Sequence, residues 1–258
     1  MADEVVKILD NRKVNDKYYK LSFCSSELVR GAQPGQFLHI QLNPTLDPFW
    51  RRPFSFYRIR GDEIEILYEI LGRGTAMLAK KRAGEILKVM GPLGKPFRKT
   101  VKPKKRICVA GGVGLPPLLY LAEHEDVDYF LIGAKSRGEV MPDFELECIK
   151  GKVMYSTNDG SYGIKGYVTK LLERILAEEK PEDVFIQTCG PTVMMQAVRD
   201  IAEARQIEGE ASVDETMACG MGVCLGCMVK TNAGWIPSCT EGPVFQFSEL
   251  QGSLLCQP

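Results

Sequence analysis

Residues 219–227 read Cys-Gly-Met-Gly-Val-Cys-Leu-Gly-Cys, and a fourth cysteine, Cys239, follows after eleven further residues. This is the C-x4-C-x2-C…C spacing with which four thiolates hold the two irons of a plant-type [2Fe-2S] cluster. Gly220, Gly222 and Gly226 fit the same assignment, because glycine permits positive φ and lets backbone N–H groups approach sulfur closely. The candidate metal ligands are Cys219, Cys224, Cys227 and Cys239.

A structural zinc site is the alternative, since four thiolates also suit a tetrahedral zinc ion in a binding module without catalysis. Zinc sites usually have two short C-x2-C pairs and no glycine-lined gap of four residues, so the spacing favours the iron-sulfur cluster. The stretch around the cysteines is too short for a core of its own and needs a covalent or metal staple. Residues 213–258 are therefore predicted to form a small C-terminal [2Fe-2S] domain.

If the predicted cluster exchanges electrons with a nicotinamide, the rest of the chain must hold a further redox cofactor. A [2Fe-2S] cluster accepts one electron at a time, whereas a reduced nicotinamide gives a hydride. An intermediary that handles both is needed between them, and a flavin is the usual one. The preceding residues should therefore carry a flavin site and a nicotinamide site.

Residues 1–98 have the pattern of an antiparallel β-barrel. Short apolar or alternating runs, separated by turn residues, predict strands at 5–9, 18–23, 37–42, 54–59, 64–68 and 86–90. One helical stretch is predicted at 75–81. This region is the candidate FAD-binding domain.

Two segments of the barrel have features that bind a diphosphate. Arg52-Pro53-Phe54-Ser55 leads into a strand, where Arg52 can form a bidentate, charge-assisted pair and Ser55 offers a hydroxyl to a flavin edge. Gly74 and Thr75 open the predicted helix, where backbone N–H groups can face phosphate. Taken alone, such segments are more often an edge-strand arginine and an ordinary helix cap.

Residues 99–212 change to alternating strands and helices after a charged connection at 99–106. β-rich runs at 107–110, 129–132, 153–155 and 184–187 alternate with amphipathic stretches, which predicts a parallel sheet covered on both faces. This is the candidate NAD-binding α/β domain, so the whole chain is predicted as a multi-domain β plus α/β protein.

The nucleotide site is predicted from three turns that follow strands. Gly111, Gly112 and Gly114 form a glycine turn where a dinucleotide phosphate could lie, although it is not the G-x-G-x-x-G fingerprint. Cys189 and Gly190 could pack near the nicotinamide, although a turn that ends a strand is an equally simple account. Asp159 could accept hydrogen bonds from ribose hydroxyls, which would favour NAD over NADP, but a surface turn explains it equally well. The choice between NAD and NADP stays open.

In this order, the motifs resemble the ferredoxin reductase superfamily over nearly the whole chain, and within it the electron-transfer subunits of type B dihydroorotate dehydrogenases. The resemblance implies that FAD contacts residues 52–55, Leu67, Tyr68, Glu69, Gly74 and Thr75, and that NAD lies on the sheet domain. It also implies a partner, an FMN-containing catalytic subunit that oxidises dihydroorotate, in a heterotetramer of two copies of each. Electrons would pass from FMN through the cluster to FAD and leave on NAD. A related flavin iron-sulfur subunit serving ferredoxin or sulfur metabolism is the alternative within redox chemistry.

Composition excludes other classes of function. The 258 residues include 33 basic and 33 acidic side chains, which leaves no electrostatic footprint for nucleic acid or an anionic membrane surface. The acidic amino terminus lacks the regions of a secretory signal, so we expect a cytoplasmic protein. Nine cysteines are unusual for such a chain, because thiols there are kept reduced and disulfides rarely persist, so another chemistry should account for them. Neither His39 nor His124 belongs to a nucleophile pair, and no catalytic residue is predicted. Four further cysteines receive no role: Cys24, Cys108, Cys148 and Cys256.

Overall fold

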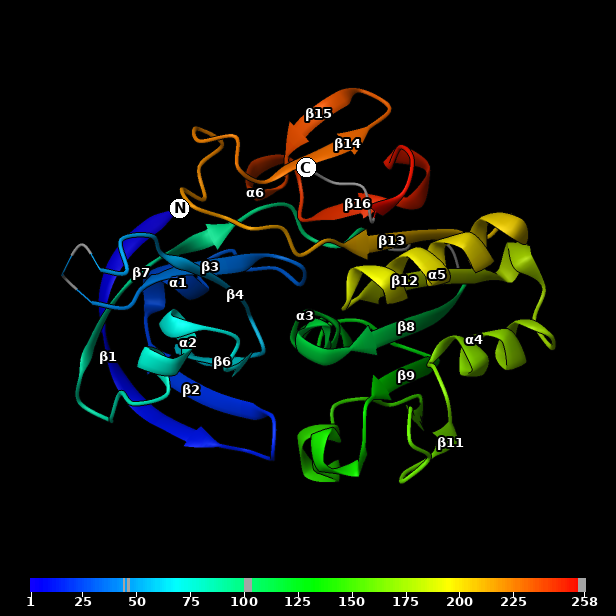
Figure 1. Cartoon of the computed structure of the whole chain (residues 1–258), viewed down its shortest axis with the longest axis horizontal. Helices are drawn as coiled ribbons and strands as arrows, with labels where there is room; N and C mark the ends of the chain where they lie inside the picture. The colour runs from blue at the N-terminus through cyan, green and yellow to red at the C-terminus, as the bar shows by residue number, and fades with distance from the viewer. Residues whose placement is uncertain (44, 46, 100–103, 255–258) are drawn as a thin grey trace.

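The chain is built from two sheets and a smaller C-terminal unit, which follow one another along the sequence (Figure 1). The computed structural model describes residues 1–43, 45, 47–99 and 104–254. Residues 100–103 of the predicted charged connection, and Cys256, lie outside the described residues. In Figure 1 the first sheet is blue and cyan, the second green and yellow, and the C-terminal unit lies above both in orange and red.

The first sheet is an open antiparallel barrel of seven strands in the order β4-β3-β7-β1-β2-β6-β5. The bounds of its strands are Ala2–Lys13 (β1), Tyr18–Cys24 (β2), Phe37–Gln41 (β3), Arg52–Ser55 (β4), Arg58–Arg60 (β5), Glu63–Glu69 (β6) and Ile86–Leu93 (β7). Two short helices, Ser26–Val29 (α1) and Arg73–Leu78 (α2), accompany them. In β1, Val6 and Ile8 are buried whereas Val5 and Lys7 are exposed, the alternation of a strand with one face on a core. The predicted antiparallel barrel is confirmed.

One predicted strand is wrong in detail, because residues 54–59 divide between β4 and β5. These two strands lie at opposite ends of the strand order, so residues 56 and 57 carry the chain from one edge of the sheet to the other. Phe56 and Tyr57 are both fully buried, and the Tyr57 N–H donates to the carbonyl oxygen of Glu65 at 3.0 Å. The crossing residues are as apolar as strand residues, which is why the sequence shows a single run.

The second sheet has seven strands in the order β11-β10-β9-β8-β12-β13-β16, parallel except at β16. Its strands are Lys105–Gly111 (β8), Tyr129–Ala134 (β9), Lys152–Thr157 (β10), Ile164–Lys165 (β11), Val184–Cys189 (β12), Glu208–Ser212 (β13) and Val244–Gln246 (β16). The helices are Leu115–Ala122 (α3), Thr169–Leu176 (α4) and Thr192–Ala204 (α5), with one-turn 3-10 helices at Gly112–Gly114 (η1), Arg137–Glu139 (η2), Asp143–Glu145 (η3) and Pro181–Asp183 (η4).

Both faces of this sheet are covered, as predicted. Along β8, Ile107 and Val109 pack with α4 and α5, while Cys108 and Ala110 pack with α3 on the other face. A strand buried on both sides reads as a continuous apolar run, which is how β8 appears in the sequence. Within the described ranges, no helix combines the length and the apolar character needed to cross a membrane.

The C-terminal unit is anchored on both sheets. It contains a hairpin of Met228–Thr231 (β14) and Gly234–Pro237 (β15), a short helix at Ser238–Glu241 (α6) and a last 3-10 turn at Phe247–Glu249 (η5). Its strand β16 pairs antiparallel with β13, and Phe245, Phe247 and Leu250 join the core of the second sheet. The C-terminal unit therefore shares the hydrophobic core of the second sheet. The predicted domain boundaries, 1–98, 99–212 and 213–258, stay predictions.

A group of buried charges joins the barrel to the second sheet, and we call it the Glu145 cluster: Glu145, Lys20, Tyr57, Arg58, Glu65 and Glu123. The carboxylate of Glu145, on η3, accepts hydrogen bonds from Lys20 Nζ at 2.8 Å, Arg58 Nη1 at 2.8 Å and the Tyr57 hydroxyl at 3.0 Å. Only 2% of the Glu145 side chain is exposed. Since the donors come from β2 and the 57–58 stretch of the barrel, this cluster fixes how the two sheets face each other.

Candidate cofactor-binding site

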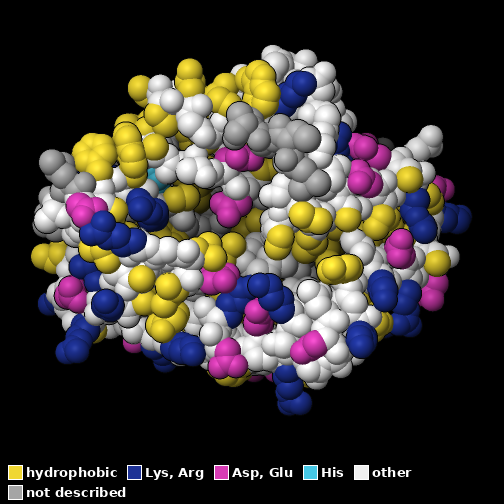
Figure 2. All heavy atoms as spheres, in the orientation of Figure 1, with side chains coloured by type: hydrophobic (Ala, Val, Ile, Leu, Met, Phe, Trp, Pro, Cys, Tyr) yellow, Lys and Arg dark blue, Asp and Glu magenta, His cyan; other side chains and the backbone are white. Residues whose placement is uncertain are grey.

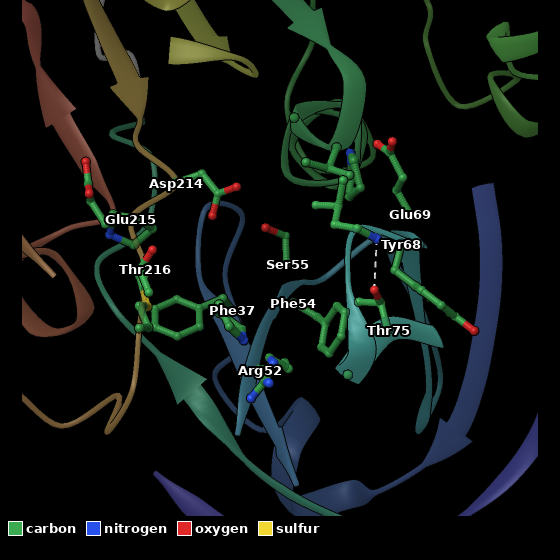
Figure 3. A pocket seen from close by; sticks show the side chains of 18 of the residues that line it. Phe37, Arg52, Phe54, Ser55, Tyr68, Glu69, Thr75, Asp214, Glu215 and Thr216 are labelled. Atoms are coloured by element: carbon green, nitrogen blue, oxygen red, sulfur yellow. Dashed lines mark hydrogen bonds between the residues drawn. The ribbon is translucent and has the colours of Figure 1, made fainter. Parts of the chain in front are cut away.

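A cleft of about 660 Å³ opens where the barrel, the second sheet and the segment before the cysteines meet (Figure 3). Its walls come from β4, β6 and the start of α2 on the barrel side, and from η1 and the end of β12 on the sheet side. Residues 212–218 form the third wall. Figure 2 shows this face hollowed where the barrel meets the sheet. The size is that of a pocket for a small molecule or cofactor.

The cleft brings together most of the residues predicted to bind cofactors, although these are spread over 139 positions of sequence from Arg52 to Gly190. The predicted residues that line it are Arg52, Pro53, Phe54, Ser55, Leu67, Tyr68, Glu69, Gly74, Thr75, Gly114, Cys189 and Gly190. Three predicted residues do not line it: Gly111, Gly112 and Asp159.

On the barrel side, the two predicted diphosphate-binding segments touch each other. A Cβ on Gly74 would lie 2.9 Å from Nε of Arg52, so the guanidinium group packs closely against the start of α2. Arg52 also donates to the carbonyl oxygen of Trp50. The Thr75 hydroxyl accepts the N–H of Leu71 at 2.9 Å and so helps to cap α2 (Figure 3). The guanidinium group of Arg52 and the first residues of α2 thus lie together at one corner of the cleft.

On the sheet side, two glycine turns are packed without any space for side chains. A Cβ on Gly114 would lie 2.1 Å from the carbonyl oxygen of Cys189, and one on Gly190 would lie 2.7 Å from the carbonyl oxygen of Gly111. Gly190 also has φ +152. Because Ala110 and Cys189 are paired across β8 and β12, these contacts bring both turns to the same edge of the sheet. The resulting wall is closely packed backbone and lies beside β6 of the barrel.

The three predicted residues outside the cleft lie along the edge that leads away from it. Gly111 ends β8, and Gly112 follows with φ +54. Asp159 comes just after β10, and its Oδ1 accepts the N–H of Ser161 at 2.9 Å and the Ser161 hydroxyl at 2.6 Å. These hydrogen bonds lower the pKa of Asp159, so the side chain is a carboxylate.

The sequence analysis missed the third wall of the cleft, Asp214, Glu215 and Thr216 (Figure 3). Asp214 faces the cavity with an exposed side chain, and the partial loss of solvation between the walls of the cleft raises its pKa. Burial, followed by the charge of Asp214, raises the pKa of Glu215. Burial and Asp214 also raise the pKa of the Cys189 thiol to about 12. The available signal was a run of three polar residues that is separated by two residues from the first cysteine of the cluster motif.

Backbone N–H groups of the cysteine loop donate hydrogen bonds to two of its cysteine sulfur atoms. Sγ of Cys219 accepts the N–H of Met221 at 3.4 Å and that of Cys224 at 3.5 Å, while Sγ of Cys239 accepts the N–H of Gly222 at 3.1 Å. Burial opposes ionisation of Cys219, but these donors outweigh it and lower the pKa of Cys219 to about 6. A thiolate is the form that ligates a metal, and the N–H donors around Cys219 and Cys239 suit bound thiolates, although burial and the neighbouring Cys227 raise the pKa of the Cys239 thiol to about 12.

The loop is seated on the barrel. A Cβ on Gly220 would lie 2.7 Å from Nδ1 of His39, a fully buried residue of β3. Burial lowers the pKa of His39 to about 4, so the ring is neutral. Within the described residues no group of three or more His, Cys, Asp or Glu side chains is arranged to hold a metal ion in this structure. The four cysteines as a ligand set therefore stay a prediction that rests on spacing and on the donors around sulfur.

Comparison with known proteins supports the same assignment. The family model of the iron-sulfur cluster binding domain of dihydroorotate dehydrogenase B matches residues 214–251. The dihydroorotate dehydrogenase B (NAD(+)) electron transfer subunit of Clostridium acetobutylicum is 38% identical over 95% of this chain and 96% of that relative. The corresponding subunit of Desulforamulus reducens is 33% identical over 93% of this chain and 94% of the relative. These matches favour the iron-sulfur interpretation over a zinc-stapled module.

Solved structures share the fold. A chain of the NADH-dependent reduced ferredoxin-NADP oxidoreductase has a TM-score of 0.84 at 24% identity, covering 96% of this chain and 90% of that one. The ferredoxin reductase of carbazole 1,9a-dioxygenase has a TM-score of 0.67 at 17% identity, covering 80% and 66%. The predicted ferredoxin-reductase-like fold is thereby confirmed. On the strength of the full-length relatives, the chain belongs to the family of dihydroorotate dehydrogenase B (NAD(+)) electron transfer subunits.

Proposed function

We propose that this chain relays electrons between NAD and the catalytic subunit of a dihydroorotate dehydrogenase in pyrimidine biosynthesis. One observation carries the proposal: residues 214–218 line the cleft and continue directly into Cys219. A cofactor in the cleft would therefore contact the residue next to the first predicted cluster ligand. The same cleft joins the candidate flavin wall to the candidate nicotinamide wall, so all three redox groups would meet around it.

FAD is assigned to the barrel side of the cleft. Arg52 and the start of α2, at Gly74 and Thr75, would hold the diphosphate, since the guanidinium already lies against that helix start. Ser55 lines the cleft from β4 and offers its hydroxyl to the isoalloxazine edge. Residues 67–69 of β6, with Phe54, would complete the wall beside the ring.

NAD is assigned to the sheet side. The closely packed backbone at Gly114 and Gly190 would let a nicotinamide ring approach a flavin held by the barrel, because neither glycine carries a side chain into the cleft. The dinucleotide would then follow the edge of the sheet past Gly111 and Gly112. Asp159, a carboxylate at the end of that edge, would accept hydrogen bonds from ribose hydroxyls.

The four cysteines divide into an outer and an inner pair. Cys224 is exposed and Cys219 half-buried, whereas Cys227 and Cys239 are buried against the barrel. When bound, a [2Fe-2S] cluster transfers single electrons. The outer cysteines would face a partner while the inner pair faces the barrel, so the loop can connect the surface to the cleft.

The proposed partner is an FMN-containing catalytic subunit, in a complex of two copies of each chain. Met221, Val223 and Leu225 surround the outer cysteines with side chains that are 49%, 76% and 59% exposed. Figure 2 shows apolar side chains gathered over this C-terminal unit. Apolar side chains of this size on a surface are typical of a protein interface. Electrons would enter here, pass through the cluster to FAD, and leave as a hydride on NAD.

A cytoplasmic location fits this proposal. Besides the four proposed cluster ligands, the described residues include Cys24, Cys108, Cys148 and Cys189, and none of these four forms a disulfide. Free thiols persist in a reducing compartment, where disulfides are rare. Membrane fractionation of the native protein, followed by immunodetection, would test the location, with recovery in an extracellular or membrane fraction contradicting it.

The function is tested by co-expressing this chain with a candidate FMN subunit and measuring orotate formation from dihydroorotate at the expense of NAD⁺. The expected result is NAD⁺ reduction that requires both chains. In the same complex, Cys224→Ser should abolish NAD⁺ reduction by dihydroorotate but preserve the reduction of ferricyanide by NADH, which needs only the flavin. Full dihydroorotate-dependent activity in the cysteine variant would contradict the proposed electron path.

A further inference from the structure

A second cavity, of about 400 Å³, lies beside the cleft, between the turn joining β1 to β2 and the end of β9. Lys17 and Glu69 line it from the barrel, and Ser136 and Glu139 line it from the second sheet. Glu69 also lines the cleft, so the two cavities meet at this side chain. The second cavity therefore extends from the candidate flavin site toward the sheet edge assigned to NAD.

Lys17 stands at the junction of the two cavities. Its Nζ lies 3.5 Å from the carboxylate of Glu69 and 3.2 Å from that of Glu139, and only 13% of its side chain is exposed. The side chain of Asn15 fixes the turn by accepting the N–H groups of Lys17 at 2.9 Å and of Tyr18 at 2.8 Å. The barrel thus presents one ammonium group to the second sheet at a fixed position.

The ammonium group stands over the glycine turn of the second sheet. A Cβ on Gly112 would lie 3.8 Å from Nζ of Lys17, ordinary contact distance, and Gly112 has φ +54, where side chains are disfavoured. An anion resting on the face of this turn would therefore be within reach of the amine. Neither Lys17 nor any other residue of the barrel turn belongs to the nucleotide site predicted from the sequence.

The charges around Lys17 indicate that its present partners are exchangeable. Two carboxylates share one amine, which leaves an excess negative charge. Glu139 has a second partner, because its Oε2 also accepts the N–H of Lys135 at 3.2 Å. Lysine carries its charge on a flexible stem and can change partners at little cost. Glu139 can therefore lose Lys17 without being left unpaired.

We infer that Lys17 binds the diphosphate of the nicotinamide dinucleotide, and that Glu139 competes with this diphosphate for the amine. This inference rests on the proposed function, since it concerns the dinucleotide of that reaction. It makes the barrel a direct contributor to nucleotide binding, so the dinucleotide would bridge the two sheets. An interdomain ion pair without such a role would involve the same residues but respond differently to substitution.

The test uses the full chain loaded with FAD and its cluster, and measures kcat and KM for NADH with ferricyanide as acceptor. Lys17→Met should raise KM about tenfold, the effect of losing one hydrogen bond to a charged group, with kcat nearly unchanged. Lys17→Arg should restore most of the affinity. Glu139→Gln should lower KM, because the competing carboxylate is gone. The matched control is Lys150→Met, which removes an 82% exposed lysine that pairs with Asp126 at the surface, and its KM should equal that of the native chain.

Opposite effects of the Lys17 and Glu139 substitutions on KM, with the slope of KM against salt reduced in Lys17→Met, would support the inference. Equal effects of the two substitutions on KM, or no effect of either, would overturn the inference and show that the ion pair only joins the sheets. In that case, NADH oxidation by the native chain would still support the proposed function. If NADH does not reduce the flavin of the native loaded chain, both the inference and the proposed function fail.

Discussion

Replacing Glu145 with glutamine should weaken the junction between the barrel and the second sheet. The carboxylate of Glu145 accepts three hydrogen bonds at 3.0 Å or less, two of them from the cationic side chains Lys20 and Arg58. Glutamine preserves the shape of the side chain but removes its charge and one acceptor. The two cations would stay buried with less compensation, since only 8% of the Lys20 side chain and 5% of the Arg58 side chain are exposed.

The size of the effect follows from what remains around the cations. Removing one partner of a buried ion pair typically costs about 3–5 kcal/mol, because a buried charge loses its compensation. Here Lys20 keeps Glu65 at 3.1 Å, and Arg58 keeps Glu123 at 2.6 Å. We therefore expect the lower end of that range, about 3 kcal/mol less free energy of unfolding.

Urea denaturation of the full chain, followed by circular dichroism, would measure this loss. A decrease of about 3 kcal/mol should lower the urea midpoint by about 1 M or more. Asp126→Asn is the matched control: Asp126 pairs with Lys150, both side chains are more than 80% exposed, and such pairs contribute about 0–1 kcal/mol. If the two variants unfold at the same urea concentration, the Glu145 cluster does not stabilise the junction and the reasoning is refuted.

The stability difference between the native chain and Glu145→Gln should depend on pH. Burial alone would raise the pKa of Glu145, but the hydrogen bonds from Lys20 and Arg58 outweigh it and lower the pKa. A folded pKa below the unfolded value of about 4.3 gives stability that is present above that value and lost as pH falls through the folded pKa. The difference between the native chain and Glu145→Gln should therefore shrink as pH falls below about 4.3. A difference that stays constant down to acid unfolding would contradict the pKa direction.

Three further substitutions test the cofactor assignments. Arg52→Ala should weaken FAD binding to the apoprotein about 100-fold in a fluorescence titration, because a bidentate charge-assisted pair is lost, and unchanged affinity would remove Arg52 from the site. Gly114→Ala should prevent flavin reduction by NADH in stopped-flow measurements while FAD stays bound, since the added Cβ would lie 2.1 Å from the Cys189 carbonyl oxygen. A native reduction rate would show that the packed backbone at Gly114 and Gly190 is not needed. Cys224→Ser should abolish the electron paramagnetic resonance signal of the reduced cluster without loss of FAD, and a normal signal would exclude Cys224 as a ligand.

The local features of the fold and site could be predicted from the sequence. The cysteine motif and the strand-helix alternation of residues 107–212 are short-range patterns, and both agree with the family and the fold found here. Arg52 and Gly74 were each predicted as phosphate-binding residues, but their contact was not, because it depends on how β4 and α2 meet in the barrel. The strand β16 was also missed, since three residues of a loop-rich tail give no periodic signal of pairing with β13.

The residues that sequence reasoning missed altogether are charged residues at the boundary between sheets. A glutamate in a three-residue turn, such as Glu145, or a lysine in a hairpin, such as Lys17, is normally solvated, and nothing nearby in sequence distinguishes it. Glu145 receives its charge partners from positions 125 and 87 residues away, and Lys17 reaches Glu139 across 122 residues. Such pairs depend on the relative orientation of the sheets, which no local pattern encodes. In a relay whose proposed flavin and nicotinamide sites lie on different sheets, Glu145 is a side chain through which the orientation of the sheets can be altered without touching either proposed cofactor wall.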